Sequence, residues 1–345
     1  MNICIIIYIG ILLIYGITRI FIKDIKNRNK FFLDVSFVFL FIILAIREPY
    51  SDMNEYLKSF HWINGMSLKS FLNYNIEIFF KCLSYIIGKI WLNDRFYMII
   101  LDIITCVGPY MFIKRYSKNY LLSLLLFISI GTYSAQFYII RQAIAVTILL
   151  LSLKYIEEKK IFKFVALVII ASLFHKSSII FLLVYLFDKF SRKNKIIVFL
   201  ILFVMIFSFR SVFYNIIKTS FYAEYVGSQY DVYGHGYGQL ALYIILLAFC
   251  LIMNWKKKDT DRKEEILLSM ALIGALIQIM ATQIAIASRL IYDFSMAFTI
   301  LPVNSIMKLK KQSDKSAIAF VIIIIVLIYL YYICPITGYT TILAN

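Results

Sequence analysis

Residues 131–190 read GTYSAQFYIIRQAIAVTILLLSLKYIEEKKIFKFVALVIIASLFHKSSIIFLLVYLFDKF, and this segment limits the class of protein that the chain can form. It is almost entirely apolar, yet it contains Arg141 with Gln142 and His175 with Lys176. Placing a cation in a bilayer costs at least a few kcal/mol, so such a residue usually faces a cavity or another polar group. The segment therefore predicts membrane-crossing helices whose polar residues share a cavity with polar groups from elsewhere in the chain.

The composition excludes an ordinary soluble domain. The chain has 345 residues, of which 62% are hydrophobic, and a mean hydropathy of +0.84. Soluble domains are closer to half apolar, and no polar stretch here is longer than a loop of about 30 residues. Apolar runs long enough to cross a bilayer recur along the chain. We therefore predict an all-α polytopic integral membrane protein with a single transmembrane domain over residues 1–345.

The net charge of +17 does not indicate nucleic-acid binding, because the basic residues lie in short loops between apolar runs rather than on one face. Basic loops of this kind encode orientation in a membrane. The five cysteines are scattered and none forms a CxxC pair, so no disulfide framework and no metal site is indicated. We expect neither a metal nor a cofactor.

Six basic loops determine the predicted topology. Placing all of them in the cytoplasm follows the positive-inside rule and predicts about twelve transmembrane helices, with both chain ends outside. Successive spans must alternate in direction, and this works only if Ile76–Trp91 does not cross the membrane. The shortness and internal lysines of this segment favour a re-entrant or interfacial helix near 76–91. The predicted spans are Ile3–Ile22, Phe31–Ile46, Phe96–Ile113, Tyr120–Ile140, Arg141–Tyr155, Phe162–Phe174, Ser177–Phe187, Ile196–Phe209, Leu240–Met253, Ile266–Ala287, Leu290–Met307 and Ala317–Ile333.

This topology places polar residues from distant parts of the chain at the extracytoplasmic ends of their helices. It does so for Arg47, Asp52, Arg141, His175, Arg289 and an extracytoplasmic loop over residues 210–238. Random placement would divide them between the two sides of the membrane. The sequence therefore predicts one polar cavity that opens away from the cytoplasm.

Residues 47–56, REPYSDMNEY, follow the second span and combine a cation with carboxylates. Arg47 suits an anion, and the Asp52 carboxylate suits a hydroxyl that must be oriented or deprotonated. The alternative is an ordinary charged loop at the membrane surface.

Arg141, His175 and Arg289 are the further candidates for chemistry. The planar fork of Arg141 suits phosphate, although an arginine at a helix end can also reach the interface without a ligand. His175 suits general acid or base catalysis near neutral pH, or it lies at a hairpin tip among headgroups. Arg289 is a second phosphate-binding candidate, or it forms an intrahelical ion pair with Asp293.

The loop over residues 210–238 contains FYAEYVGSQYDVYGHGYGQ, in which tyrosines alternate with acids, amides and a histidine. Aromatic rings pack against the apolar faces of sugars, while carboxylates and amides bind sugar hydroxyls. The loop therefore suits a lid over a carbohydrate, and the alternative is a flexible surface loop. The candidate glycan-binding residues are Gln142, Tyr222, Glu224, Tyr225 and His235.

The order of these motifs resembles a known family. REPYSDMNEY, RQAIAVTILLLSLKYIEEKKIFKF, ASLFHKSSIIFLLVYL, the tyrosine-rich loop and ASRLIYDFSMAFTILP together resemble the EpsG-like group of Wzy-type capsular polysaccharide polymerases, over roughly Ala45–Pro302. The Arg-Gln segment with the downstream Phe-His segment is the most specific part of the match. The family usually has a glycine before the aspartate of the first motif, whereas this chain has Ser51 before Asp52.

The resemblance implies a membrane glycosyltransferase that extends capsular polysaccharide or exopolysaccharide outside the cytoplasmic membrane of the cell envelope. The donor would be a chain on a polyprenyl diphosphate such as undecaprenyl diphosphate, and the acceptor a lipid-linked repeat unit. Arg47, Arg141 and Arg289 would hold the diphosphate, and Asp52 or His175 would be the base. The implied partners are this glycan, the lipid bilayer, and a chain-length regulator with other assembly proteins.

Three other activities stay open. A glycan ligase differs only in its acceptor, so no residue separates it from a polymerase. A flippase for lipid-linked oligosaccharide would favour internal repeats and a charged pathway at the membrane midplane, but the polar groups here gather at one side. A membrane-bound acyltransferase can also use a histidine, but no further signature for that activity is present.

Overall fold

The computed structural model describes residues 3–209, 212, 215, 219, 236–254, 261–283 and 285–333, which form fifteen α-helices and short 3₁₀ helices. The all-α prediction is confirmed. These residues fall into two compact units, one within Met1–Ser152, Phe162–Ile179 and Val321–Asn345, the other within Leu153–Ile161 and Ile180–Phe320. The single transmembrane domain stays a prediction.

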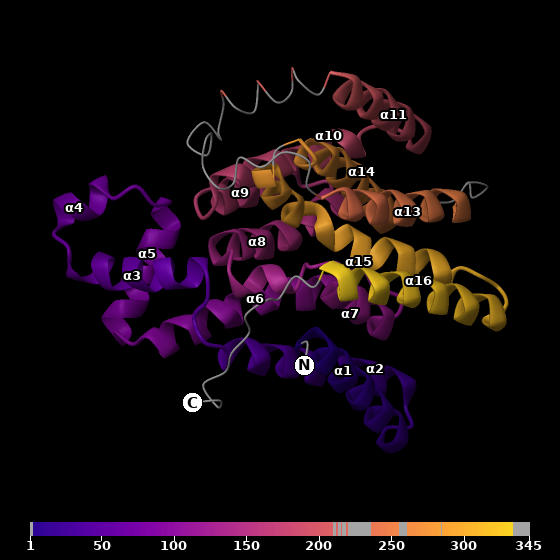
Figure 1. Ribbon diagram of the computed structural model, residues 1–345, viewed down its shortest axis with the longest axis horizontal. Helices are drawn as coiled ribbons and strands as arrows, with labels where there is room; N and C mark the ends of the chain where they lie inside the picture. Colours follow the sequence, from indigo (N-terminus) through magenta and orange to yellow (C-terminus); the bar gives the residue numbers. More distant parts are fainter. Residues whose placement is uncertain are drawn as a thin grey trace. The chain divides into compact units, whose positions relative to one another are not determined.

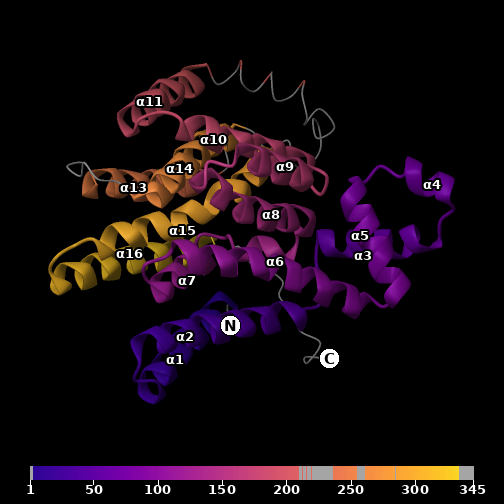
Figure 2. The same ribbon diagram turned by 180° about the vertical axis from the view of Figure 1, so that it is seen from behind.

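Antiparallel helices build the first unit. The Asp24 side chain accepts a hydrogen bond from Asn27 N at 2.7 Å and so caps the second helix. Figures 1 and 2 show the first two helices side by side. The helices are α1 (Ile3–Phe21), α2 (Ile25–Ala45), α3 (Asp52–Gly65), α4 (Leu68–Asn73), α5 (Ile78–Ile90), α6 (Asp94–Tyr116), α7 (Tyr120–Ser129), α8 (Ile140–Glu157), α9 (Ile161–Ser172) and part of α16 (Gln312–Ile333).

The second unit is arranged around one buried helix, α14 (Arg262–Ala281). Gly274 permits a close approach, because a Cβ atom at this position would lie 3.1 Å from Phe294 and 3.2 Å from Phe298. In Figures 1 and 2 the other helices of this unit lie around α14. They are α10 (Leu182–Asp188), α11 (Arg192–Ser208), α13 (Tyr237–Met253) and α15 (Tyr292–Met307).

A network of charged side chains, with Lys195 and Asp188 buried and Arg262 exposed, joins three helix ends in the second unit. The Lys195 side chain is 1% exposed, and its Nζ lies 3.1 Å from Glu265 and 3.8 Å from Asp188. Arg262 Nη1 donates to Asp188 at 2.9 Å. These contacts connect α10, α11 and α14, and the cytoplasmic placement of the basic loops stays a prediction. A buried charge of this kind requires its partner, because the unpaired ion would remain desolvated.

Four helices are long and apolar enough to cross a membrane: Ile3–Phe21, Asp94–Tyr116, Arg262–Ala281 and Ala287–Met307. This count covers only the residues that the structure describes, which also include shorter apolar helices such as Tyr237–Met253. A chain with several such helices is a multi-pass helical membrane protein. The predicted total of about twelve spans stays a prediction.

The predicted span Tyr120–Ile140 is wrong as one continuous helix. α7 ends at Ser129, a 3₁₀ helix (η1) covers Ser134–Phe137, and α8 begins at Ile140. Gly131 has φ of +83°, which a glycine adopts without a steric penalty. Residues 131–137 are all buried, so protein rather than lipid surrounds this irregular backbone.

Two other predicted span ends are also 3₁₀ helices. Lys176–Phe181 forms η2 before α10, so the span predicted over Ser177–Phe187 is only partly α-helical. Ala285–Ile291 forms η4 between α14 and α15, where the predicted spans end at Ala287 and begin at Leu290. His175 therefore lies just before one helix break, and Arg289 lies within another.

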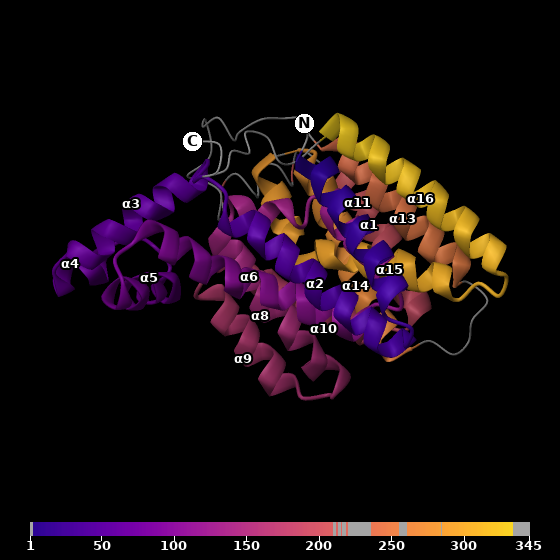
Figure 3. The same ribbon diagram turned by 90° about the horizontal axis from the view of Figure 1, so that it is seen from below.

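The polar region after the second predicted span forms helices. Figure 3 shows α3, α4 and α5 grouped together. α3 and α5 share a core with α6 and α8 that includes Tyr56, Phe60, Phe80 and Tyr97. α5 has 13 residues, which confirms a short helix near 76–91 but leaves its place in the membrane a prediction. Lys81 is 2% exposed and donates to the Phe71 carbonyl at 2.5 Å, so it joins helices instead of facing headgroups.

Ser51 holds a backbone conformation that suits glycine. Its φ of 53° and ψ of −129° match the first central position of a type II′ turn, and Met53 N donates to Tyr50 O at 3.2 Å. A side chain in such a region costs about 1–3 kcal/mol. A glycine at this position would adopt the same conformation without this cost.

We expect Ser51→Gly to stabilise the protein by about 1–2 kcal/mol, because glycine removes the steric penalty at positive φ. The midpoint of thermal unfolding in detergent measures this change. Lys58→Gly, at an exposed position inside α3, is the matched control and should lower the midpoint, because glycine within a helix costs about 0.5–1 kcal/mol. Equal shifts for both variants would contradict the turn assignment.

Candidate functional site

Four polar side chains from four segments of the first unit meet around Glu77. Arg141 Nη1 donates to Glu77 Oε2 at 2.5 Å, and His175 Nδ1 lies 3.9 Å from Glu77 Oε1. The Tyr56 ring lies under the guanidinium, with 5.4 Å between Arg141 Cζ and the ring centroid. We call Tyr56, Glu77, Arg141 and His175 the Glu77 cluster.

The local fold explains why these residues meet. Arg141 is the second residue of α8, whose Ile140 and Ile144 are buried in the core shared with α3 and α5. Glu77 is the N-cap residue of α5, and the adjoining backbone is tied to the end of α9, because Phe79 N donates to Leu173 O at 3.1 Å. The Phe79 and Phe174 rings pack edge to face at 5.6 Å. This contact holds His175 near Glu77.

The Glu77 cluster is shielded from solvent but not sealed. The side chains of Arg141, His175 and Glu77 are 28%, 22% and 10% exposed. Burial by itself raises the pKa of Glu77, but the nearby Arg141 charge and hydrogen bonds outweigh this effect and hold its pKa below the usual value. Glu77 is therefore a carboxylate at neutral pH, and Arg141 is paired with an anion.

Glu77 is the site residue that sequence reasoning missed. It lies at the start of the short segment predicted over Ile76–Trp91, which also contains Lys81 and Lys89. The available signal was a single carboxylate at the start of a helix that is apolar apart from its lysines. Its partners are 64 and 98 residues away along the chain, so no local pattern identifies them.

Arg47 is in a different environment from Arg141. It is 3% exposed, and its Nη1 donates to Asp102 Oδ2 at 2.6 Å and to the Leu44 carbonyl at 2.7 Å. Arg95 Nη1 donates to the Arg47 carbonyl at 2.6 Å. These bonds join the C-terminal end of α2 to α6.

The remaining predicted residues are placed as follows. Asp52 is half-buried at the start of α3, and Gln142 is 2% exposed next to Arg141 in α8. Arg289 is half-buried in η4 of the second unit, so a cavity shared with Arg141 stays a prediction. Tyr222, Glu224, Tyr225 and His235 lie outside the described residues, as does most of the predicted lid.

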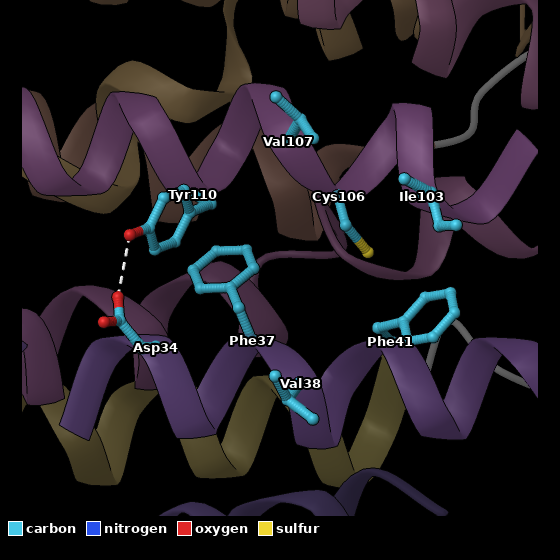
Figure 4. A pocket seen from close by; sticks show the side chains of 8 residues that line it. All are labelled: Asp34, Phe37, Val38, Phe41, Ile103, Cys106, Val107 and Tyr110. Atoms are coloured by element: carbon cyan, nitrogen blue, oxygen red, sulfur yellow. Dashed lines mark hydrogen bonds between the residues drawn. The ribbon is translucent and has the colours of Figure 1, made fainter. Parts of the chain in front are cut away.

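A separate groove lies between α2 and α6 (Figure 4). Its walls are apolar except at one end, where the Tyr110 hydroxyl donates to Asp34 Oδ1 at 2.7 Å and accepts from Lys114 Nζ at 2.9 Å. The groove contains no member of the Glu77 cluster. Among the described residues, no three His, Cys, Asp or Glu side chains come together as a metal site would require.

The long apolar helices and the partly buried polar cluster define a polytopic helical membrane protein. The model of the EpsG family matches residues 30–342, so the chain belongs to the EpsG family. No curated protein and no solved structure matches the chain. Family membership associates the chain with exopolysaccharide biosynthesis at a membrane.

Proposed function

We propose that the protein polymerises polyprenyl-diphosphate-linked repeat units into polysaccharide on the extracytoplasmic face of the cytoplasmic membrane. The observation that carries this proposal is the Glu77 cluster, in which a partly exposed arginine lies near a histidine. A transfer from a lipid diphosphate needs a cation for the leaving group and a base for the acceptor, and these two side chains supply both. Membership of the EpsG family supports the same pathway.

The proposed reaction is one substitution at the anomeric carbon of the donor sugar. The acceptor hydroxyl oxygen forms a bond to this carbon while the bond from the carbon to the diphosphate oxygen breaks. The electron pair of the broken bond leaves with the lipid diphosphate, whose charge Arg141 stabilises through two donors. The hydroxyl proton passes to the base. Arg47 and Arg289 are the further proposed diphosphate ligands.

His175 or Asp52 takes the proton, and the contacts favour His175. Its Nδ1 lies 3.9 Å from a Glu77 oxygen, and the same carboxylate binds Arg141 at 2.5 Å. A carboxylate next to an imidazole orients the ring and stabilises its protonated form. Diphosphate binding and proton transfer would then occur within one cluster. Gln142 and the predicted lid residues are the proposed contacts to the glycan.

We expect His175→Ala to lower polymerisation by about 10²–10⁴-fold, because a general base contributes this much. Asp52→Asn should have a smaller effect if His175 is the base. The readout is the length distribution and sidedness of lipid-linked glycan in cells that carry each variant. A polymerase defect leaves single repeat units on the lipid at the extracytoplasmic face.

His61→Ala is the matched control. His61 is 50% exposed and pairs with Asp94 on the surface, so its loss should leave polymer length unchanged. Repeat units trapped on the cytoplasmic side in His175→Ala would identify a flippase instead. Normal polymer in both His175→Ala and Asp52→Asn would remove these residues from the active site.

A further inference from the structure

We propose that Glu77 is an internal competitor for the anion-binding side of Arg141, and that the diphosphate of the substrate displaces it toward His175. The inference rests on the proposed function, because it assumes that Arg141 binds a lipid diphosphate. It adds a regulatory step to this site: the anion position is occupied by the protein's own carboxylate until the substrate arrives.

The Arg141 contacts carry the first part of this inference. A guanidinium binds carboxylates and phosphates with the same parallel donors, and Glu77 Oε2 already accepts from Nη1 at 2.5 Å. Tyr56 occupies another part of the guanidinium, because its hydroxyl lies 3.5 Å from Nε and its ring lies under Cζ. A diphosphate that uses the Nη1 side must therefore replace Glu77.

The position of Glu77 allows this replacement without unfolding. It occupies the N-cap position of α5 without a side-chain capping hydrogen bond, and the backbone on both sides is held in place. Lys81 Nζ donates to the Tyr74 carbonyl at 3.1 Å, and Phe79 N donates to Leu173 O at 3.1 Å. Rotation of the Glu77 side chain is therefore sufficient, while the backbone of the site remains in place.

His175 provides the second position for the displaced carboxylate. Its Nδ1 lies 3.9 Å from Glu77 Oε1, so the two atoms make no hydrogen bond now, but a rotated carboxylate would reach the imidazole. A carboxylate that is 90% buried would be costly to leave unpaired. Movement toward His175 avoids this cost, and the carboxylate then stabilises the imidazolium that forms when the acceptor proton is taken up. Binding of the lipid-diphosphate donor substrate would in this way prepare His175 to act as the base.

Competition from Glu77 lowers the apparent affinity for diphosphate, because only the fraction of protein in which Glu77 has left Arg141 can bind the anion. Removing the charge of Glu77 should therefore tighten binding and slow catalysis at the same time. A residue that merely stabilised the fold, or that touched the diphosphate favourably, would not separate these two readouts.

The experiment measures binding of farnesyl diphosphate to purified full-length protein in lipid nanodiscs, together with polymerisation by the same variants. We expect Glu77→Gln to tighten binding about tenfold and to slow polymerisation at least about tenfold, because a base without its oriented partner is impaired. Glu77→Asp, with a shorter side chain, should tighten binding less and retain more activity. Glu55→Gln, at an exposed position in α3, should change neither quantity.

Two outcomes overturn the inference: unchanged or weaker binding in both Glu77→Gln and Glu77→Asp, or tighter binding with undiminished polymerisation. The thermal unfolding midpoint of each variant identifies a folding defect. If Glu77→Gln has such a defect, the binding and activity of Glu77→Asp test the inference instead, because this variant keeps the charge in the cluster. Arg141→Ala separates this inference from the proposed function. If Arg141→Ala binds farnesyl diphosphate as tightly as the wild type, Arg141 is not a diphosphate ligand, whatever Glu77 does.

Discussion

Replacing Arg141 with alanine is expected to lower polymerisation at least about 100-fold, the usual cost of removing one group that stabilises charge in the transition state. Single lipid-linked repeat units should then accumulate at the extracytoplasmic face. Arg141→Lys should recover only part of the activity, because lysine keeps the charge but lacks the planar fork. The length distribution of the lipid-linked glycan measures both effects.

The loss of Arg141 also leaves Glu77 without its closest cation, so stability must be measured beside activity. Arg141→Ala with Glu77→Gln should restore the thermal unfolding midpoint but not polymer formation, because the unpaired carboxylate is gone while the diphosphate ligand is still missing. Lys58→Ala removes an exposed cation of α3 and serves as the control. Normal polymer length in Arg141→Ala would exclude the Glu77 cluster as the active site.

Replacing Asp102 with alanine is expected to destabilise the protein by about 3–5 kcal/mol, because it leaves a buried arginine without its partner. Arg47 and Asp102 are 3% and 0% exposed and are joined at 2.6 Å. Thermal unfolding in detergent is the measurement.

The double variant Arg47→Met with Asp102→Leu should recover most of the lost stability, since apolar residues of similar size often replace a buried ion pair at little cost. Its activity decides the role of Arg47. Polymer formation by this stable double variant would show that Arg47 joins α2 to α6 and does not bind diphosphate. A stable but inactive double variant would support the diphosphate role, and a stable Asp102→Ala would contradict the ion-pair assignment.

Some helix boundaries could be predicted from the local sequence alone. The first predicted span, Ile3–Ile22, matches α1, and Ala317–Ile333 lies within α16. Both are long apolar runs next to basic loops, so length and hydropathy define them. The span predicted over Tyr120–Ile140 failed because hydropathy does not detect an irregular segment whose residues are themselves apolar and buried, as in the break after Gly131.

Some residues of the candidate site could be predicted from the sequence, whereas their partners could not. Arg141 and His175 were identified because charges are scarce and costly within apolar runs. Their meeting point was not identified, because Glu77 and Tyr56 come from α5 and α3, which are far from Arg141 and His175 along the chain. Asp102 lies within the predicted span Phe96–Ile113, and no local pattern shows that it pairs with Arg47.

The amino-acid sequence by itself determined that this is a helical membrane protein of the EpsG family and that a few cations lie at the ends of its apolar runs. These properties follow from composition and local order, because each apolar run must satisfy its own backbone hydrogen bonds in a membrane. Only the tertiary structure decided which of those cations are paired, and with what. Glu77 holds Arg141 and Asp102 holds Arg47. Such pairs depend on how helices pack across long sequence separations, and desolvation of both partners makes that choice energetically decisive.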